Sequence, residues 1–227
     1  MGKLVFTTQD IRPHLLSTFQ EHVARIISNL EEAKEFALAG GAALILRGDV
    51  DRLTRDLDFF GLSTSNVDQL VYAAIKALRN SGLEVEIIQM NQGFGRLVAT
   101  SGTDRVEIDF ANDARLFPLE QYNLLPILSG EELGADKVLA IFGRAEPRDF
   151  IDLFSIESKY GLEYLCRLAI EKDPGFSLDV FVQMLSSFSR FRRSEFDLDD
   201  STFEELCDQV NNWIELITNP NFMSTND

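Results

Sequence analysis

Three strand-like segments follow one another closely between residues 83 and 111, and their connections limit the folds open to this chain. The segments read LEVEIIQM, GRLVATS and DRVEIDFA, and the connections NQGF and SGT each contain glycine. Connections this short are typical of antiparallel hairpins, because parallel strands need a longer crossover. Earlier in the chain come a helical pattern near 12–33, strand-like EFALAG and DLDFFG, and a second helical pattern from Val67 to Leu78 that Asn66 can cap. The first half therefore predicts a small mixed sheet with helices on it.

The second half of the chain has a different pattern. Strand signals fade after about residue 115, and helical periodicity continues to the end. The pairs Ser129/Glu132 and Ser201/Glu204 have the spacing of a capping box at a helix start. The stretch FPLEQYNLLP is interpreted as a crossing between the two halves. We predict an α+β fold, with a mixed-sheet core over residues 1–118 and a helical C-terminal lobe over 119–227.

The charge balance restricts the partners that such a chain can bind. It has 21 Lys and Arg residues against 37 Asp and Glu residues, a formal net charge of −16. Such a chain repels nucleic acid unless its few cations gather locally. No apolar run approaches the roughly 20 residues that span a bilayer. The start also has no signal-peptide pattern, so we expect a cytoplasmic protein with no membrane partner.

Residue counts exclude several classes of enzyme. The chain has 2 Cys and 2 His residues. Two cysteines are too few for a disulfide framework, and their spacing is not that of a metal knuckle. Two histidines within one helical pattern make a zinc hydrolase or a Ser-His-Asp triad a poor match.

Paired carboxylates are the strongest indication of chemistry. In the DLDFF segment, Asp56 and Asp58 face the same side because side chains alternate along a strand. Two close carboxylates repel unless a cation neutralises them, and Mg²⁺ prefers oxygen ligands. Asp109, in VEIDF, is a natural third ligand, and we predict that it lies on a neighbouring strand. Three carboxylates around two ions would activate an attacking hydroxyl and neutralise a triphosphate.

This interpretation competes with a simpler one, in which a D-x-D pair at a strand end only faces water. The pair Gly40-Gly41 upstream favours the functional interpretation, because backbone amides at a glycine turn can approach phosphate.

In this pattern the sequence resembles the nucleotidyltransferase superfamily with a polymerase-β-like core, and within it the AbiEii-like toxins of bacterial toxin–antitoxin systems. The resemblance rests on FALAGGAALIL, R-x-x-T-R-D-L-D-F-F, the VEIDF strand and the later block of Lys137 with R-x-x-x-R-D-F-I-D-L. These motifs cover most of residues 35–155, and the remainder matches only in its helical character.

The resemblance implies roles for individual residues. Gly40 and Gly41 become the turn on the phosphate side, and the metal ligands become Asp56, Asp58 and Asp109. Lys137 is expected to contact the nucleoside triphosphate, with Arg55 among the groups that bind it. Asp149 or Asp152 supplies a further acidic residue. One departure is visible, because Ala42 and Ala43 stand where the superfamily often has a hydroxyl residue that binds phosphate.

The later block also has a physical interpretation of its own. Lys137 lies among apolar residues, so its stem can pack while its ammonium group reaches out; the alternative is a solvated lysine. Asp149 and Asp152 share a helix face at a spacing of three. Asp149, close to the expected helix start, is also explained by capping, whereas Asp152 is not.

These observations predict a metal-dependent nucleotidyltransferase that moves NMP from an NTP to an acceptor, with Mg²⁺ as cofactor. The family resemblance implies a toxin that acts on tRNA 3′ ends, with a cognate antitoxin protein as partner. One alternative is transfer to a small molecule or a protein hydroxyl. Another is a catalytically weakened nucleotide-binding or interaction module, for which Ala42 is the main support.

Overall fold

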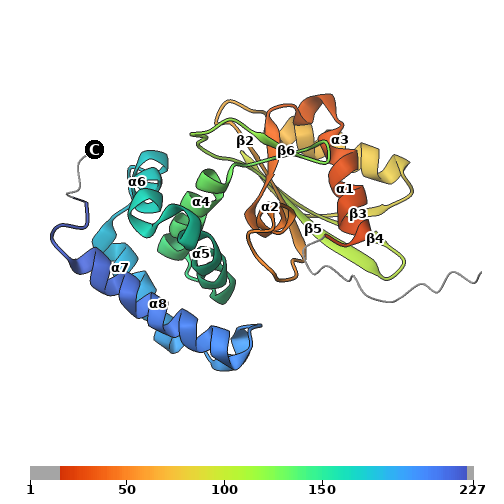
Figure 1. Cartoon of the computed structure of the whole chain (residues 1–227). Helices are drawn as coiled ribbons and strands as arrows, with labels where there is room; N and C mark the ends of the chain where they lie inside the picture. Colours follow the sequence, from red (N-terminus) through yellow and green to blue (C-terminus); the bar gives the residue numbers. More distant parts are fainter. Residues whose placement is uncertain (1–15, 224–227) are drawn as a thin grey trace, which may run out of the picture.

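The molecule has one part built on a sheet and one part built of helices (Figure 1). The structure is a computed structural model and describes residues 16–223. The described residues form seven strands: β1 (Phe36–Ala39), β2 (Asp56–Gly61), β3 (Glu84–Asn91), β4 (Phe94–Ser101), β5 (Asp104–Asn112), β6 (Glu120–Tyr122) and β7 (Leu125–Ile127). This arrangement confirms the predicted α+β fold with a small mixed sheet followed by helices.

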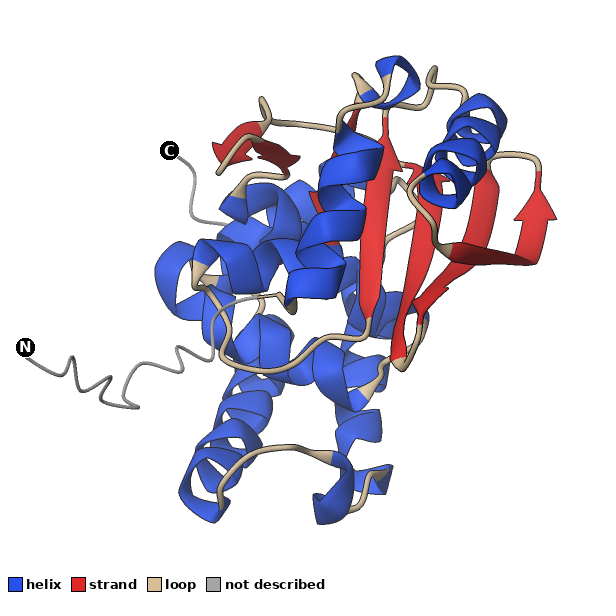
Figure 2. Ribbon diagram, turned by 90° about the vertical axis from the view of Figure 1, so that its right-hand side faces the viewer, coloured by secondary structure: helices blue, strands red, loops and turns tan. Residues whose placement is uncertain are grey.

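The strands lie side by side in the order β3-β4-β5-β2-β1-β7-β6. Figure 2 shows the long strands of the sheet with helices packed beside them. Strands β3, β4 and β5 form the predicted antiparallel meander. Strand β2 lies parallel to β5 and antiparallel to β1. The inner strands β5 and β2 are therefore parallel neighbours. Their N-terminal ends lie side by side, and so do their C-terminal ends.

The helices divide between the two parts. Three belong to the sheet part: α1 (Thr18–Ser28), α2 (Gly40–Arg47) and α3 (Val67–Asn80). Five follow in the helical part: α4 (Gly130–Gly143), α5 (Pro147–Tyr160), α6 (Leu162–Lys172), α7 (Leu178–Ser186) and α8 (Asp200–Thr218). Short 3₁₀ helices cover Glu31–Ala33, Ser187–Arg190 and Arg193–Glu195. Of the helix predicted near 12–33, residues 12–15 lie outside the described residues.

Alternation along the strands separates an apolar face of the sheet from a polar one. Leu57 and Phe59 of β2 are buried, as is Phe110 of β5, whose ring stacks on that of Phe59. Helix α3 covers this face. Gly95, which pairs with Phe110, lies so close to α3 that a Cβ added to it would collide with Val71. The opposite face carries Asp56 and Asp58 and turns away from α3.

The segment interpreted as a crossing between the halves is instead part of the sheet. Strands β6 and β7 form a hairpin, and β7 pairs with β1 through Leu38 and Ile127. Asn123 and Leu124 make the turn with positive φ angles of 47° and 70°. The prediction that strands end near residue 115 was therefore wrong, because three-residue strands are too short to show alternation. The boundary between residues 118 and 119 stays a prediction.

Neither of the two expected capping boxes forms in full. In the first, the Glu132 side chain accepts from the backbone of Leu116 and Phe117 instead. Helix α8 begins at Asp200, and the side chain of Asp199 accepts a hydrogen bond from the backbone N–H of Thr202 at 3.0 Å. Asp is as good an N-cap as Ser, so the helix starts before Ser201. Ser129 does cap α4, by accepting from the backbone N–H of Glu132 at 3.2 Å.

Within the described residues, no helix has both the length and the apolar character to cross a membrane.

The contact between α3 and β4 predicts the effect of a small substitution. A Cβ added at Gly95 would lie 2.5 Å from Cγ2 of Val71. Gly95→Ala should therefore lower the free energy of unfolding by about 1–3 kcal/mol, and Val71→Ala in the same chain should recover part of that loss. Urea unfolding measures both. Gly143→Ala is the control, because nothing lies within 4 Å of its added Cβ; equal midpoints for Gly95→Ala and Gly143→Ala would contradict the packing.

Candidate active site

A cleft of about 360 Å³ lies where the polar face of the sheet meets the helical part. Among the described residues its lining includes five acidic side chains: Asp56, Asp58, Glu107, Asp109 and Glu146. It also includes seven cationic ones: Arg52, Arg55, Arg96, Arg105, Lys137, Arg144 and Arg148. The cleft therefore gathers cationic side chains in a chain whose net charge is −16, although buried carboxylates behind the lining pair with three of them.

The pairing of β2 with β5 brings the carboxylates together. Asp58 pairs with Asp109, and Asp56 pairs with Glu107. Side chains of paired residues on parallel neighbours stand on the same face, so the carboxylates share the polar face of the sheet. The predictions that Asp56 and Asp58 share one face and that Asp109 lies on a neighbouring strand are confirmed.

The glycine pair lets the chain pass close to two of these side chains. Strand β1 ends at Ala39 and α2 begins at Gly40, whose φ is +55°. A Cβ at Gly40 would lie 2.0 Å from Oδ2 of Asp58, and one at Gly41 would lie 2.5 Å from Nη2 of Arg52. Only glycine leaves room for both contacts. Ala42 and Ala43 are fully buried in the core.

Two of the three aspartates are held by arginine. Arg148 donates to Asp56 at 2.8 Å, and the Thr54 hydroxyl donates to the same carboxylate at 2.5 Å. Although burial acts to raise the pKa of Asp56, the hydroxyl and the guanidinium outweigh it, and this pKa lies below its ordinary value. Arg96 donates to both oxygens of Asp109, at 2.7 and 2.6 Å.

Asp58 differs from its neighbours because it makes no side-chain hydrogen bond or ion pair with any described residue of the chain. Burial raises its pKa to about 6, and the charges of Asp56 and Asp109 add to this effect. The result is a half-buried carboxylate beside two others, aimed at the glycine turn.

The chemistry of this donor set suits a hard divalent cation, since Asp56, Asp58 and Asp109 all offer oxygen. The unpartnered carboxylate of Asp58 is the observation that fits a cation most directly. Over residues 16–223, however, no three His, Cys, Asp or Glu side chains are arranged to hold a metal ion as they stand. Arg148 and Arg96 occupy two of the three carboxylates, so those arginines would have to move for all three to bind one cation.

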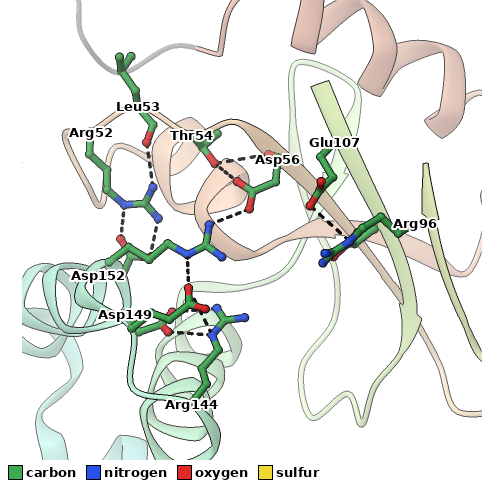
Figure 3. Close-up of polar contacts among 12 residues, drawn as sticks. Arg52, Leu53, Thr54, Asp56, Arg96, Glu107, Arg144, Asp149 and Asp152 are labelled. Carbon is green, nitrogen blue, oxygen red and sulfur yellow. Dashed lines mark hydrogen bonds and ion pairs between the residues drawn. The ribbon is translucent and has the colours of Figure 1, made fainter. Parts of the chain in front are cut away.

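A network of buried charges joins the helical part to the sheet part (Figure 3). Arg52 donates to both oxygens of Asp152 on α5, at 2.6 and 2.7 Å. Lys137 on α4 lies 2.9 Å from the same carboxylate and 3.3 Å from that of Asp149. Arg144 also donates to Asp149, at 3.0 and 3.1 Å. Both aspartates have no exposed surface, so each buried charge is matched by partners.

This network decides between the alternatives left open for these residues. Lys137 is 5% exposed, so it is not a solvated surface lysine, and its ammonium lines the cleft. Asp149 lies in the first turn of α5, but Glu146 is the N-cap and the Asp149 carboxylate binds side chains instead. Burial acts to raise the pKa of Asp152, and Lys137 and Arg52 outweigh it, so this pKa lies below its ordinary value.

Arg96 and Arg105 were not singled out from the sequence, and the structure places both in the lining of the cleft. Arg96 was detectable, because the short SGT connection pairs Ser101 with Asp104, and counting back along that hairpin places Arg96 opposite Asp109. Arg148 stands in the recognised R-D-F-I-D-L block, but no local pattern aims it at Asp56, 92 positions away. Arg55 lies exposed at the rim of the cleft. The roles expected for the site residues stay predictions.

Comparison with known proteins gives one family and several related folds. The model of the family described as nucleotidyl transferase AbiEii toxin, type IV TA system, matches residues 23–165. JHP933 from Helicobacter pylori is 21% identical with a TM-score of 0.54, over 89% of this chain and 93% of that chain. A candidate nucleotidyltransferase from H. pylori is 19% identical with a TM-score of 0.58, over 92% and 97%. These two structures have the same fold as this chain. No curated protein matches the chain.

The raised pKa of Asp58 predicts a pH-dependent difference in stability. A folded-state pKa of about 6, above the ordinary 3.8, means that ionised Asp58 destabilises the folded chain. Asp58→Asn should therefore be more stable than the wild type above pH 6, and the difference should vanish towards pH 4. Urea midpoints of both proteins at several pH values, with a chelator present, measure it. A difference that does not change with pH would contradict the assignment.

The buried network predicts the opposite effect for Asp152. Removing its carboxylate leaves Arg52 and Lys137 facing each other in a buried place, so Asp152→Ala should lower the free energy of unfolding by about 3–5 kcal/mol. The control is Glu171→Ala on the exposed side of α6, which should change it by less than about 0.5 kcal/mol. Similar unfolding curves for the two variants would show that the network does not join the two parts.

Proposed function

The chain belongs to the AbiEii nucleotidyltransferase toxin family of type IV toxin–antitoxin systems, and from this premise we propose that it transfers NMP from an NTP to an acceptor hydroxyl with the help of Mg²⁺. The chain is a nucleotidyltransferase by family. The observation that carries the proposal is the unpartnered carboxylate of Asp58, which lies between Asp56 and Asp109 and against the glycine turn.

We propose that the NTP binds between the glycine turn and the helical part. The backbone amides of Gly40 and Gly41 begin a helix, and helix N-termini favour phosphate. The Lys137 ammonium lines the same cleft, and the carboxylates of Asp152 and Asp149 raise its pKa against the effect of burial, so it stays charged towards a triphosphate. Asp152 and Asp149 act as positioning residues, because they fix Arg52, Lys137 and Arg144.

Asp56, Asp58 and Asp109 are the residues that would hold divalent cations. Such cations, when bound, neutralise the triphosphate and stabilise the charge that develops during in-line transfer. Arg148 and Arg96, which bind Asp56 and Asp109 in this structure, would then be released from those carboxylates. Their guanidinium groups can turn to phosphate oxygens, for which arginine has a matching geometry.

For the acceptor we propose the 3′ end of tRNA, with the reaction taking place in the cytoplasm and an antitoxin protein as the partner that controls it. The support is that seven of the 21 Lys and Arg side chains line this cleft, although the chain as a whole is strongly acidic. An anionic acceptor gains from such a cleft, because neutralised phosphates release their counterions.

One assay tests this proposal. Purified protein is incubated with each labelled NTP in turn, with and without Mg²⁺ and total tRNA, and the label in RNA is counted. We expect labelling that needs both Mg²⁺ and tRNA, and we expect Asp58→Asn to lower it by a factor on the order of 10²–10³. The charge-matched control Asp179→Asn, on the exposed start of α7, should label RNA at the wild-type rate.

Other outcomes of that assay would replace the proposal. NTP consumption with no label in RNA would assign the reaction to a small molecule or a protein hydroxyl. No incorporation under any condition would favour a nucleotide-binding or interaction module without transferase activity.

A further inference from the structure

Two of the cationic side chains of the cleft have no partner. Five are held by acids: Arg52 by Asp152, Lys137 by Asp149 and Asp152, Arg144 by Asp149, Arg148 by Asp56, and Arg96 by Asp109. Arg55 and Arg105 are exposed, and neither makes a side-chain hydrogen bond or an ion pair with any described residue. Their charge is therefore available to a ligand without breaking a contact of the protein.

The sheet places these two arginines at the same rim of the cleft. Arg105, Glu107 and Asp109 alternate along β5 and face the cleft, while Val106 between them is buried. Arg55 directly precedes β2, and its carbonyl accepts from the backbone N–H of Glu107 at 3.2 Å. Because β2 and β5 are parallel, Arg55 and Arg105 lie towards the same ends of the two strands.

This rim lies away from the reactive carboxylates but within reach of a chain molecule bound to them. Arg55 is three positions before Asp58 and Arg105 is four before Asp109. At roughly 3.3 Å per residue these separations are about 10 and 13 Å along the strands. The glycine turn touches Asp58 and Arg52 instead. A triphosphate at that turn therefore leaves the rim for the second substrate.

We propose that Arg55 and Arg105 bind backbone phosphates of a single-stranded polynucleotide whose 3′ end lies at Asp58 and Asp109. This inference rests on the proposed function and names the residues that recognise its acceptor. Arg55, which the sequence alone assigned to the nucleotide, is thereby assigned to the acceptor. A guanidinium group binds phosphate through paired hydrogen bonds, and two unpaired guanidinium groups repel a cationic small molecule.

The test uses the full chain and a fluorescein-labelled single-stranded oligoribonucleotide with a free 3′ hydroxyl. Its affinity is measured by anisotropy between 50 and 200 mM salt for three proteins: the wild type, Arg55→Gln/Arg105→Gln and Arg190→Gln/Arg192→Gln. The last pair removes the same charge from exposed positions that do not line the cleft. NTP affinity in the presence of Mg²⁺ is measured alongside by calorimetry.

We expect the cleft variant to bind the oligonucleotide more weakly than the control variant. The plot of log K against log salt should be less steep than that of the wild type by about 1.4, at about 0.7 for each single-strand phosphate contact that is lost. NTP affinity should be the same in all three proteins. The KM for RNA in the labelling assay should rise in the cleft variant only.

Three results would overturn the inference. The first is an equal RNA affinity and salt slope for the two double variants. The second is an NTP affinity that falls together with RNA affinity in the cleft variant, which would place both arginines on the nucleotide. The third is a wild type that transfers nucleotide to a non-RNA acceptor only. The first two results differ from a failure of the proposed function, because the wild type still labels RNA in both of them. The third result, or a wild type that transfers nucleotide to no acceptor, contradicts the proposed function as well.

Discussion

The ion pair between Arg52 and Asp152 is the interaction on which the rest of the site depends. Arg52 stands in the loop before β2 and Asp152 on α5, so this pair fastens the helical part to the sheet. Buried charges are costly to remove from water and are tolerated only when each is matched. Lys137, Asp149 and Arg144 extend the match. These ion pairs hold the cationic side chains in fixed positions opposite the aspartates of β2 and β5.

On the opposite side of the cleft the charges are not fully matched, because three aspartates have only two arginine partners. Asp56, Asp58 and Asp109 lie close enough to repel one another, and arginines from α5 and β4 relieve two of them. The third remains unpaired, so the pKa of Asp58 rises to about 6 while that of Asp56 falls. Neighbouring carboxylates with pKa values pushed apart are typical of functional sites. A bound cation would neutralise the repulsion between the carboxylates, which contributes to the raised pKa of Asp58.

Much of the fold was predictable, because long elements carry a repeated pattern. The meander β3–β4–β5, strand β2 and helix α3 with its Asn66 cap follow from alternation, short glycine connections and capping residues. The hairpin β6–β7 was missed because its strands are three residues long. The start of α8 was misplaced because both Asp199 and Ser201 can act as an N-cap. In the structure Asp199 is the cap, so the helix begins two residues earlier.

The sequence by itself determined which residues are candidates for chemistry and which face of each strand they occupy. Asp56 and Asp58 share a face because of the period of two, and Gly40 and Gly41 are the residues that leave room for close approach. Only the tertiary structure decided the partners of those residues. Arg148 with Asp56, and Arg52 with Asp152, are pairs separated by 92 and 100 positions, and no local pattern encodes a contact of that range. The physical reason is that burial forces each charge to find its counter-charge wherever the packing of two separate parts brings one within reach.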